Sequence, residues 1–131
     1  LVGSEMCIRD SSDTRFMVFT GSDTPVILIV ESELDGILVD QAANDLISVM
    51  ALGSAMARPD QEAHRILDKS EIILVALDRD NTGAKQAWEW WLSQYPQARR
   101  WPPVEGKDPG EMLRSGIDIR DWVKAGLDTY R

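Results

Sequence analysis

Short apolar runs alternate with segments of helical periodicity over most of the chain, from residue 25 onward. Continuous runs such as Val-Ile-Leu-Ile-Val are typical of strands that are buried on both faces, as in a parallel sheet. The predicted strands cover residues 26–30, 47–52, 72–77 and 98–101, and an edge strand is predicted at 15–20.

Helical spacing of apolar residues fills the intervals between these strands. It predicts a helix at 34–44 with Leu34, Ile37, Leu38 and Ala42 inward, and a second from Pro59 to near Lys69. A third predicted helix has the stripe Ala84, Ala87, Trp88, Trp91, Leu92 and Tyr95. The last is predicted to be capped by Asp118 and to stop at Gly126, and residues 102–111 are expected to form a loop.

This alternation predicts an α/β fold of the Rossmann-like kind, with a mainly parallel sheet of about four strands and helices on both faces. Ligands bind at the carboxyl ends of the strands in such sheets. Because Glu31 and Asp78 directly follow two of the predicted strands, the fold would bring them to the same edge.

Asp78 and Asp80 lie two residues apart where the strongest predicted strand ends. Two carboxylates this close repel each other unless a cation lies between them. A hard cation such as Mg²⁺ takes oxygen ligands, often one or two carboxylates together with substrate phosphates. The alternative is an ordinary surface turn, in which aspartates are common.

Three further acids are weaker candidates for the same site. Glu31 ends the first buried strand, although an acid there also suits the start of a helix. Asp35 lies about one helical turn later and can face the same cleft, or solvent. Asp108 stands in the 102–111 segment before Pro109, where an acid also often begins a helix. Lys85 and Lys107 lie beside these acidic stretches and are candidates for contacting phosphate, or are solvated lysines.

Composition and charge restrict the class of protein. The chain has 131 residues, one cysteine and a formal net charge of −8, so a cysteine-based zinc site or disulfide framework is excluded. Proteins that bind nucleic acid with their own surface are usually basic, so metal ions or another domain would have to supply that contact here. No apolar run approaches the roughly 20 residues of a membrane span, and we expect a cytoplasmic protein. Residues 1–14 are polar without periodicity, and we expect them to be a disordered or extraneous lead before a domain at 15–127.

Four sequence segments in this order resemble the Toprim domain, most closely that of bacterial and phage DNA primases of the DnaG type. They are ILIVESELDG (27–36), MALGSAM (50–56), VALDRDNTGAKQA (75–87) and EGKDPGEML (105–113), and the resemblance covers residues 25–125.

The resemblance implies a Mg²⁺ (or Mn²⁺) centre for phosphodiester chemistry. It implies Glu31 as the catalytic acid or base and a metal-facing carboxylate, with Asp78 and Asp80 as catalytic metal ligands. Asp35 matches a second acid of the first motif and Asp108 matches the acid of the fourth, and both are implied near the metal. The sequence departs from the family's pattern at Ser32, where many relatives have glycine, and at Gly110, where many primases have another acid.

For a primase, the resemblance implies nucleotidyl transfer that makes RNA primers from ribonucleoside triphosphates on a single-stranded DNA template. It also implies partners in a replicative helicase or in other domains of a larger parent protein, from a phage, a mobile element or a host. A Toprim nuclease or topoisomerase and a non-catalytic Toprim binding module remain alternatives. A haloacid-dehalogenase-like phosphatase is a further alternative, since LDRDNT (77–82) resembles its first motif, although two predicted strand–helix units precede it here.

Overall fold

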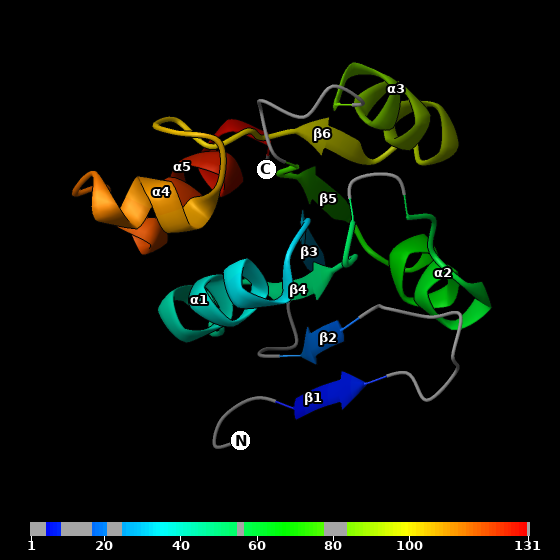
Figure 1. The fold of residues 1–131 in the computed structure, drawn as a ribbon. Coiled ribbons are helices and arrows are strands. Elements are labelled where there is room, and N and C mark those ends of the chain that lie inside the picture. Colours follow the sequence, from blue (N-terminus) through cyan, green and yellow to red (C-terminus); the bar gives the residue numbers. More distant parts are fainter. Residues whose placement is uncertain (1–4, 9–16, 21–24, 55–56, 78–83, 131) are drawn as a thin grey trace.

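The computed structural model describes residues 5–8, 17–20, 25–54, 57–77 and 84–130 (Figure 1). In the described ranges, six strands and three helices precede two final helices that follow one another directly. The elements are β1 (Glu5–Ile8), β2 (Met17–Thr20), β3 (Val26–Val30), α1 (Glu33–Ala43), β4 (Ser48–Ala51), α2 (Gln61–Asp68), β5 (Ile72–Val75), α3 (Ala84–Gln94), β6 (Ala98–Arg100), α4 (Pro109–Arg114) and α5 (Ile119–Tyr130).

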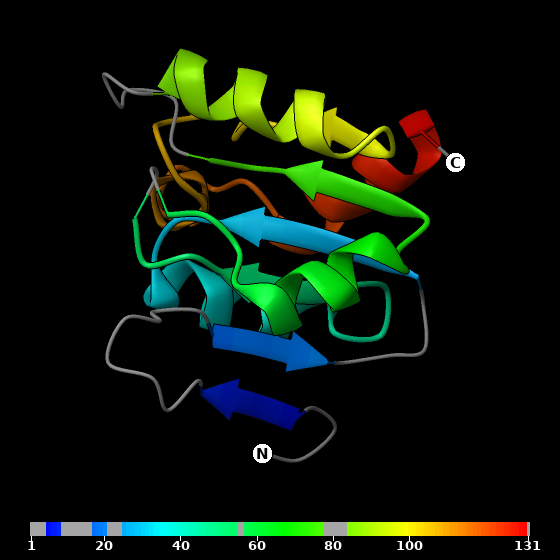
Figure 2. The ribbon, with the colours of Figure 1, turned by 90° about the vertical axis from the view of Figure 1, so that its right-hand side faces the viewer.

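The strands form one sheet with the order β1-β2-β4-β3-β5-β6 (Figure 2). The four strands from β4 to β6 are parallel to one another, which confirms the predicted α/β fold with a mainly parallel sheet. Strand β2 adds to β4 in the antiparallel direction, where an edge strand was predicted, but it is not at the edge because β1 pairs with its other side. Strand β1 pairs with β2 although it lies in the stretch expected to precede the domain, and the boundary at residue 15 stays a prediction.

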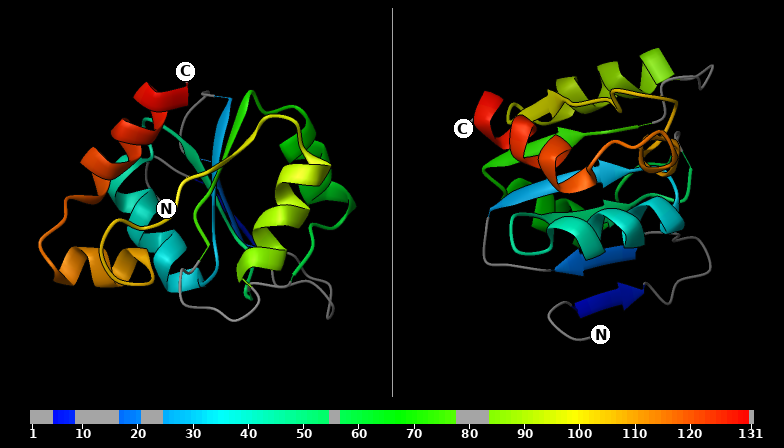
Figure 3. Two further views of the ribbon diagram at one scale, coloured as in Figure 1. Left: turned by 90° about the horizontal axis from the view of Figure 1, so that it is seen from above. Right: turned by 90° about the vertical axis from the view of Figure 1, so that its left-hand side faces the viewer.

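Helices cover both faces of the sheet, as Figure 3 shows: α2 and α3 lie on one face and α1, α4 and α5 on the other. Strand β3 packs on both layers because its side chains alternate. Val26, Leu28 and Val30 belong to the core beneath α1 and α5, whereas Ile27 and Ile29 belong to the core beneath α2 and α3. This double burial explains why the strand is apolar at every position. None of the described helices is both long and apolar enough to cross a membrane.

The helix starts follow from local sequence. Ser32 caps α1, Asp60 caps α2 and Asp108 caps α4, each side chain accepting a hydrogen bond from a backbone N–H in the first turn. The prediction of a loop through residue 111 was therefore wrong, because α4 begins at Pro109, directly after its cap.

Three predictions about helix faces and ends were also wrong. Helix α5 continues through Gly126 to Tyr130. Leu92 is 44% exposed, although it shares the apolar periodicity of α3. In α1, Leu34 is 79% exposed and Ile37 36% exposed, so the predicted inward stripe is displaced. The residues that α1 buries are Asp35, Gly36, Val39, Asp40 and Ala43.

Candidate functional site

Two neighbouring parallel strands bring their carboxyl ends to the same edge of the sheet, which we call the rim. Strands β3 and β5 are paired with Ile29 opposite Val75, and the Ala76 N–H continues the ladder by donating to the Ile29 carbonyl at 2.8 Å. Glu31 follows β3 directly, and its carbonyl accepts a 2.7 Å hydrogen bond from the Gly53 N–H after β4. Its side chain is half-buried, with Oε2 inside the protein. Glu31 therefore lies where ligands bind in sheets of this kind.

Asp78 and Asp80, the strongest candidates from the sequence, lie outside the described residues. The described part of β5 and its extension end at Leu77, which is buried. Within the described ranges, no three His, Cys, Asp or Glu side chains are arranged so that they could hold a metal ion. The predicted metal centre, which depends on Asp78 and Asp80, therefore stays a prediction.

Asp35 is 7% exposed and has a hydrogen-bond donor on each carboxylate oxygen. The Ser32 hydroxyl donates to Oδ2 at 2.8 Å, and the backbone N–H of Gly110, in α4, donates to Oδ1 at 3.1 Å. Burial raises the pKa of Asp35, and the negative charges of Asp108 and Glu31 raise it further, against the lowering effect of these two hydrogen bonds. The structure thus brings together three of the five predicted acids, Glu31, Asp35 and Asp108.

Asp108 approaches Asp35 because it caps the helix whose first turn contacts α1. Its Oδ1 accepts a 2.9 Å hydrogen bond from the Glu111 N–H. A methyl group placed on Gly110 would lie 3.3 Å from Oδ1 of Asp108 and 3.3 Å from Oδ1 of Asp35, so one point is close to both carboxylates. The same point is 3.5 Å from Nη1 of Arg114, which places a positive charge beside the two acids.

A pocket of about 420 Å³ opens beside this group of acids, between α1 and α4. Carboxylates and a guanidinium line part of it, and three leucines line the remainder. The lining residues are Ser32, Leu34, Asp35, Leu38, Asp108, Gly110, Leu113 and Arg114. The pocket therefore combines charged groups with an apolar wall that is open to solvent.

Lys85 and Lys107 are both exposed. Lys85 lies in the first turn of α3, which follows the 78–83 segment, and Lys107 immediately precedes Asp108. Their predicted contact with phosphate stays a prediction. Sequence reasoning missed Ser32, Gly110 and Arg114 as members of the site, although the Ser-x-x-Asp spacing from Ser32 to Asp35 is a recognisable helix-capping signal.

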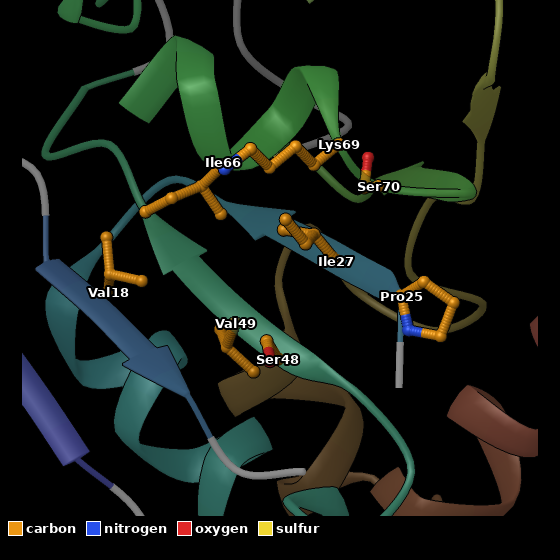
Figure 4. A pocket seen from close by; sticks show the side chains of 8 residues that line it. All are labelled: Val18, Pro25, Ile27, Ser48, Val49, Ile66, Lys69 and Ser70. Carbon is orange, nitrogen blue, oxygen red and sulfur yellow. The ribbon is translucent and has the colours of Figure 1, made fainter. Parts of the chain in front are cut away.

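A second pocket, of about 240 Å³, lies at the opposite end of the strands (Figure 4). Its wall is mostly apolar, and it contains none of the predicted site residues. The lining residues are Val18, Pro25, Ile27, Ser48, Val49, Ile66, Lys69 and Ser70. Since Pro25 precedes β3 and Ser48 begins β4, this pocket is separated from the acids by the length of the strands.

Comparison with solved structures shows a primase-like fold. The chain is similar to the crystal structure of the primase fragment of the bacteriophage T7 primase-helicase protein, with a TM-score of 0.63 and 18% sequence identity. The match covers 94% of this chain and 67% of that chain. No family model matches the sequence, and comparison with curated proteins gave no match either. At this level of identity the similarity concerns the fold.

Proposed function

We propose that the chain is a Toprim catalytic domain of a DNA primase, which carries out Mg²⁺-dependent nucleotidyl transfer. The observation that supports this most directly is that Glu31 and Leu77 lie just beyond the ends of the neighbouring parallel strands β3 and β5, at one rim. Asp78 is the next residue of the chain after Leu77. The similarity in fold to the T7 primase fragment agrees with the sequence resemblance to the Toprim domain of primases.

The donor groups suit a hard cation. Glu31 is at the rim, Asp108 lies near Asp35, and Asp78 and Asp80 come after β5 in the sequence. Every candidate donor is therefore a carboxylate oxygen, the ligand type of Mg²⁺ and Mn²⁺. The effect of neighbouring negative charges on the pKa of Asp35 supports this, since acids brought together are stabilised by a cation.

In the proposed reaction, the 3′-hydroxyl of a growing primer attacks the α-phosphate of a ribonucleoside triphosphate, and pyrophosphate leaves. Glu31 would accept the hydroxyl proton, and Asp78 and Asp80 would hold the metal. When bound, Mg²⁺ would lower the pKa of the hydroxyl and neutralise charge on the phosphate in the transition state. Lys85 and Lys107 would contact the phosphates of the substrate.

The acidic character of the chain is consistent with this proposal. Its net charge of −8 and the carboxylates at the rim repel a triphosphate in the absence of metal. A bound cation reverses the local field, so substrate binding should depend on it. We therefore expect nucleotide binding, measured by calorimetry, to require Mg²⁺ or Mn²⁺, and its absence with metal present would favour a non-catalytic binding module.

A Mn²⁺ titration tests the metal centre directly. We expect wild type to bind Mn²⁺ weakly, with a dissociation constant near millimolar, and an Asp78→Asn/Asp80→Asn double variant to lose this binding. The matched control is Asp121→Asn/Asp128→Asn, which removes two exposed carboxylates from α5 and should bind like wild type. Equal binding by all three proteins would refute the proposed site.

The product identifies the reaction that uses the centre. Incubation with Mg²⁺, a DNA template and ribonucleoside triphosphates tests for transfer, and incubation with DNA alone tests for cleavage. Metal-dependent cleavage without transfer would assign the site to a Toprim nuclease. Phosphate release from a generic phosphate ester, through a covalent aspartyl-phosphate, would assign it to the haloacid-dehalogenase-like class.

A further inference from the structure

We propose that Asp35 is a positioning residue, which ties α4 to α1 through Ser32 and Gly110 and thereby holds Asp108 near the rim, and that it is not a metal ligand. The functional half of this inference rests on the proposed metal centre. The structural half, the connection between two helices, stands independently of it.

The contacts of Asp35 carry the argument. Its two oxygens face two donors from different elements: the Ser32 hydroxyl at the start of α1 and the Gly110 N–H at the start of α4, 75 residues further along the chain. Each donor places a partial positive charge against one lone pair of the oxygen, so a cation would have to approach along a remaining lone pair. Asp35 is 7% exposed, so protein atoms cover most of it, although it lines part of the pocket between α1 and α4.

The Gly110 N–H has a specific need for this partner. The first N–H groups of a helix have no acceptor within the helix, and Gly110 is the second residue of α4. Asp108 satisfies the Glu111 N–H, which leaves the Gly110 N–H for an acceptor outside the helix. Asp35 supplies that acceptor, so its carboxylate completes the cap of a helix to which it does not belong.

Gly110 also provides the space for this contact. A side chain at this position would begin 3.3 Å from both the Asp35 and the Asp108 carboxylates, closer than carbon atoms usually approach such groups.

Three variants of the full chain test the structural half in metal-free buffer. In Asp35→Ala, the Gly110 N–H loses its acceptor, so we expect its hydrogen exchange, followed by NMR, to become about tenfold faster. The midpoint of thermal unfolding should fall by about 5–10 °C. In Asp35→Asn, the side-chain amide keeps an oxygen that can accept from the Gly110 N–H, so the hydrogen exchange of this group should match that of wild type. Asp118→Ala, which removes the exposed carboxylate that accepts from the Asp121 N–H in α5, should leave the Gly110 N–H protected.

The same proteins test the functional half when Mn²⁺ is added. A positioning role predicts that Asp35→Ala weakens Mn²⁺ binding about tenfold and that Asp35→Asn restores it to within about threefold of wild type. A purely structural role predicts unchanged binding by the folded Asp35→Ala protein. A ligand role predicts that Asp35→Asn loses binding as Asp78→Asn does, and either of these two results would overturn the proposal.

Failure of the proposed function gives a different result. If wild type itself binds no Mn²⁺, the metal centre is refuted, yet the exchange of the Gly110 N–H still reports on the connection between the helices. If Asp35→Ala leaves that exchange and the thermal midpoint unchanged, the connection is refuted, whatever the metal titration shows.

Discussion

Gly126 lies in the middle of α5, where glycine lowers helix stability, and its surroundings explain its presence. A methyl group there would lie 2.9 Å from Cε2 and Nε1 of Trp101 and 3.2 Å from Cδ1 of Leu74. The indole also donates from Nε1 to the Trp122 carbonyl at 3.1 Å, which fixes the ring against the helix. Glycine therefore permits close packing of α5 on the sheet.

We expect Gly126→Ala to lower the free energy of unfolding, measured in urea, by about 1–3 kcal/mol. The crowding of Trp101 would outweigh the gain of about 1 kcal/mol that alanine brings to a helix. Asp128→Ala, at an exposed position of the same helix, should change the free energy by no more than about 0.5 kcal/mol. If Gly126→Ala were instead more stable than wild type, α5 and the Trp101 indole would be able to move apart at little cost in free energy.

Whether a glycine stops a helix or lets it pack closely depends on what lies beside it. The sequence shows Gly126 near the end of an apolar periodicity, and a stop is the usual meaning of that pattern. Trp101, which decides the matter, lies 25 residues away and contacts the glycine only in the folded protein. The same reasoning applies to Asp35, whose acceptor role depends on Gly110.

At the scale of elements, Arg120 connects α5 to the end of α1. Its Nη1 and Nη2 donate to the two carboxylate oxygens of Asp45, with Nη2 at 2.8 Å from Oδ2, and Nη1 also reaches the Ala42 carbonyl at 3.4 Å. The Arg120 hydrogen bond holds the pKa of Asp45 below its usual range. The pair is exposed to solvent, so its contribution to stability is small.

The stabilisation from this pair should disappear in acid. Because the pKa of Asp45 is lowered by folding, the contribution is present above the pKa of the unfolded chain and is lost as pH falls through the pKa of the folded protein. We expect Asp45→Asn to lower the thermal midpoint by about 1–3 °C at pH 7 and to match wild type once the pH is well below the lowered pKa of Asp45 in the folded protein. A difference that persists in acid would assign the effect to something other than this ion pair.

The orientation of α1 is the clearest difference between sequence pattern and structure. Leu34, Ile37 and Leu38 have helical spacing and were expected to face inward, but the helix instead buries Asp35 and Val39. Periodicity identified the helix but not its buried face, because a carboxylate can be buried when another element supplies donors. That donor, the Gly110 N–H, belongs to α4. The proline and glycine residues of this segment had predicted a loop there in place of a helix.

Substitutions in α1 can check this orientation. Leu34→Ser and Ile37→Ser should each change the free energy of unfolding by no more than about 0.5 kcal/mol, because both side chains are exposed. Val39→Ala should lower it by about 1–3 kcal/mol, since the Val39 side chain of α1 is fully buried. A large loss in the two serine variants, with none in Val39→Ala, would mean that the inward stripe predicted from periodicity was correct.

Over the whole molecule, the sheet was the most predictable feature and the site the least. Strands such as β3 and β5 are apolar at every position because helices cover both faces, so the sequence identifies them without tertiary information. Glu31 could be placed at the rim for the same reason, since it ends such a strand. The proximity of Asp35 to Asp108 could not, because it depends on how a short capped helix packs against another.

The overall charge leads to a prediction about nucleic acid. The chain has 22 acidic and 14 basic residues, and binding to single-stranded DNA depends mainly on neutralising phosphates. We expect the 131-residue protein to bind a labelled oligonucleotide with a dissociation constant weaker than about 10⁻⁴ M in 0.15 M salt with Mg²⁺, measured by fluorescence anisotropy. For the same reason, it should make little or no primer by itself.

A charge-reversal variant tests whether the net negative charge of the chain is what weakens its binding to the oligonucleotide. Asp121→Lys/Asp128→Lys changes the net charge by +4 at exposed positions of α5, away from the carboxylates of the rim. If electrostatic repulsion is the cause, this protein should bind the oligonucleotide more tightly than wild type, and the difference should shrink as salt is raised. Micromolar binding or robust primer synthesis by the wild-type chain would instead mean that its own surface holds the template, in spite of its acidic charge.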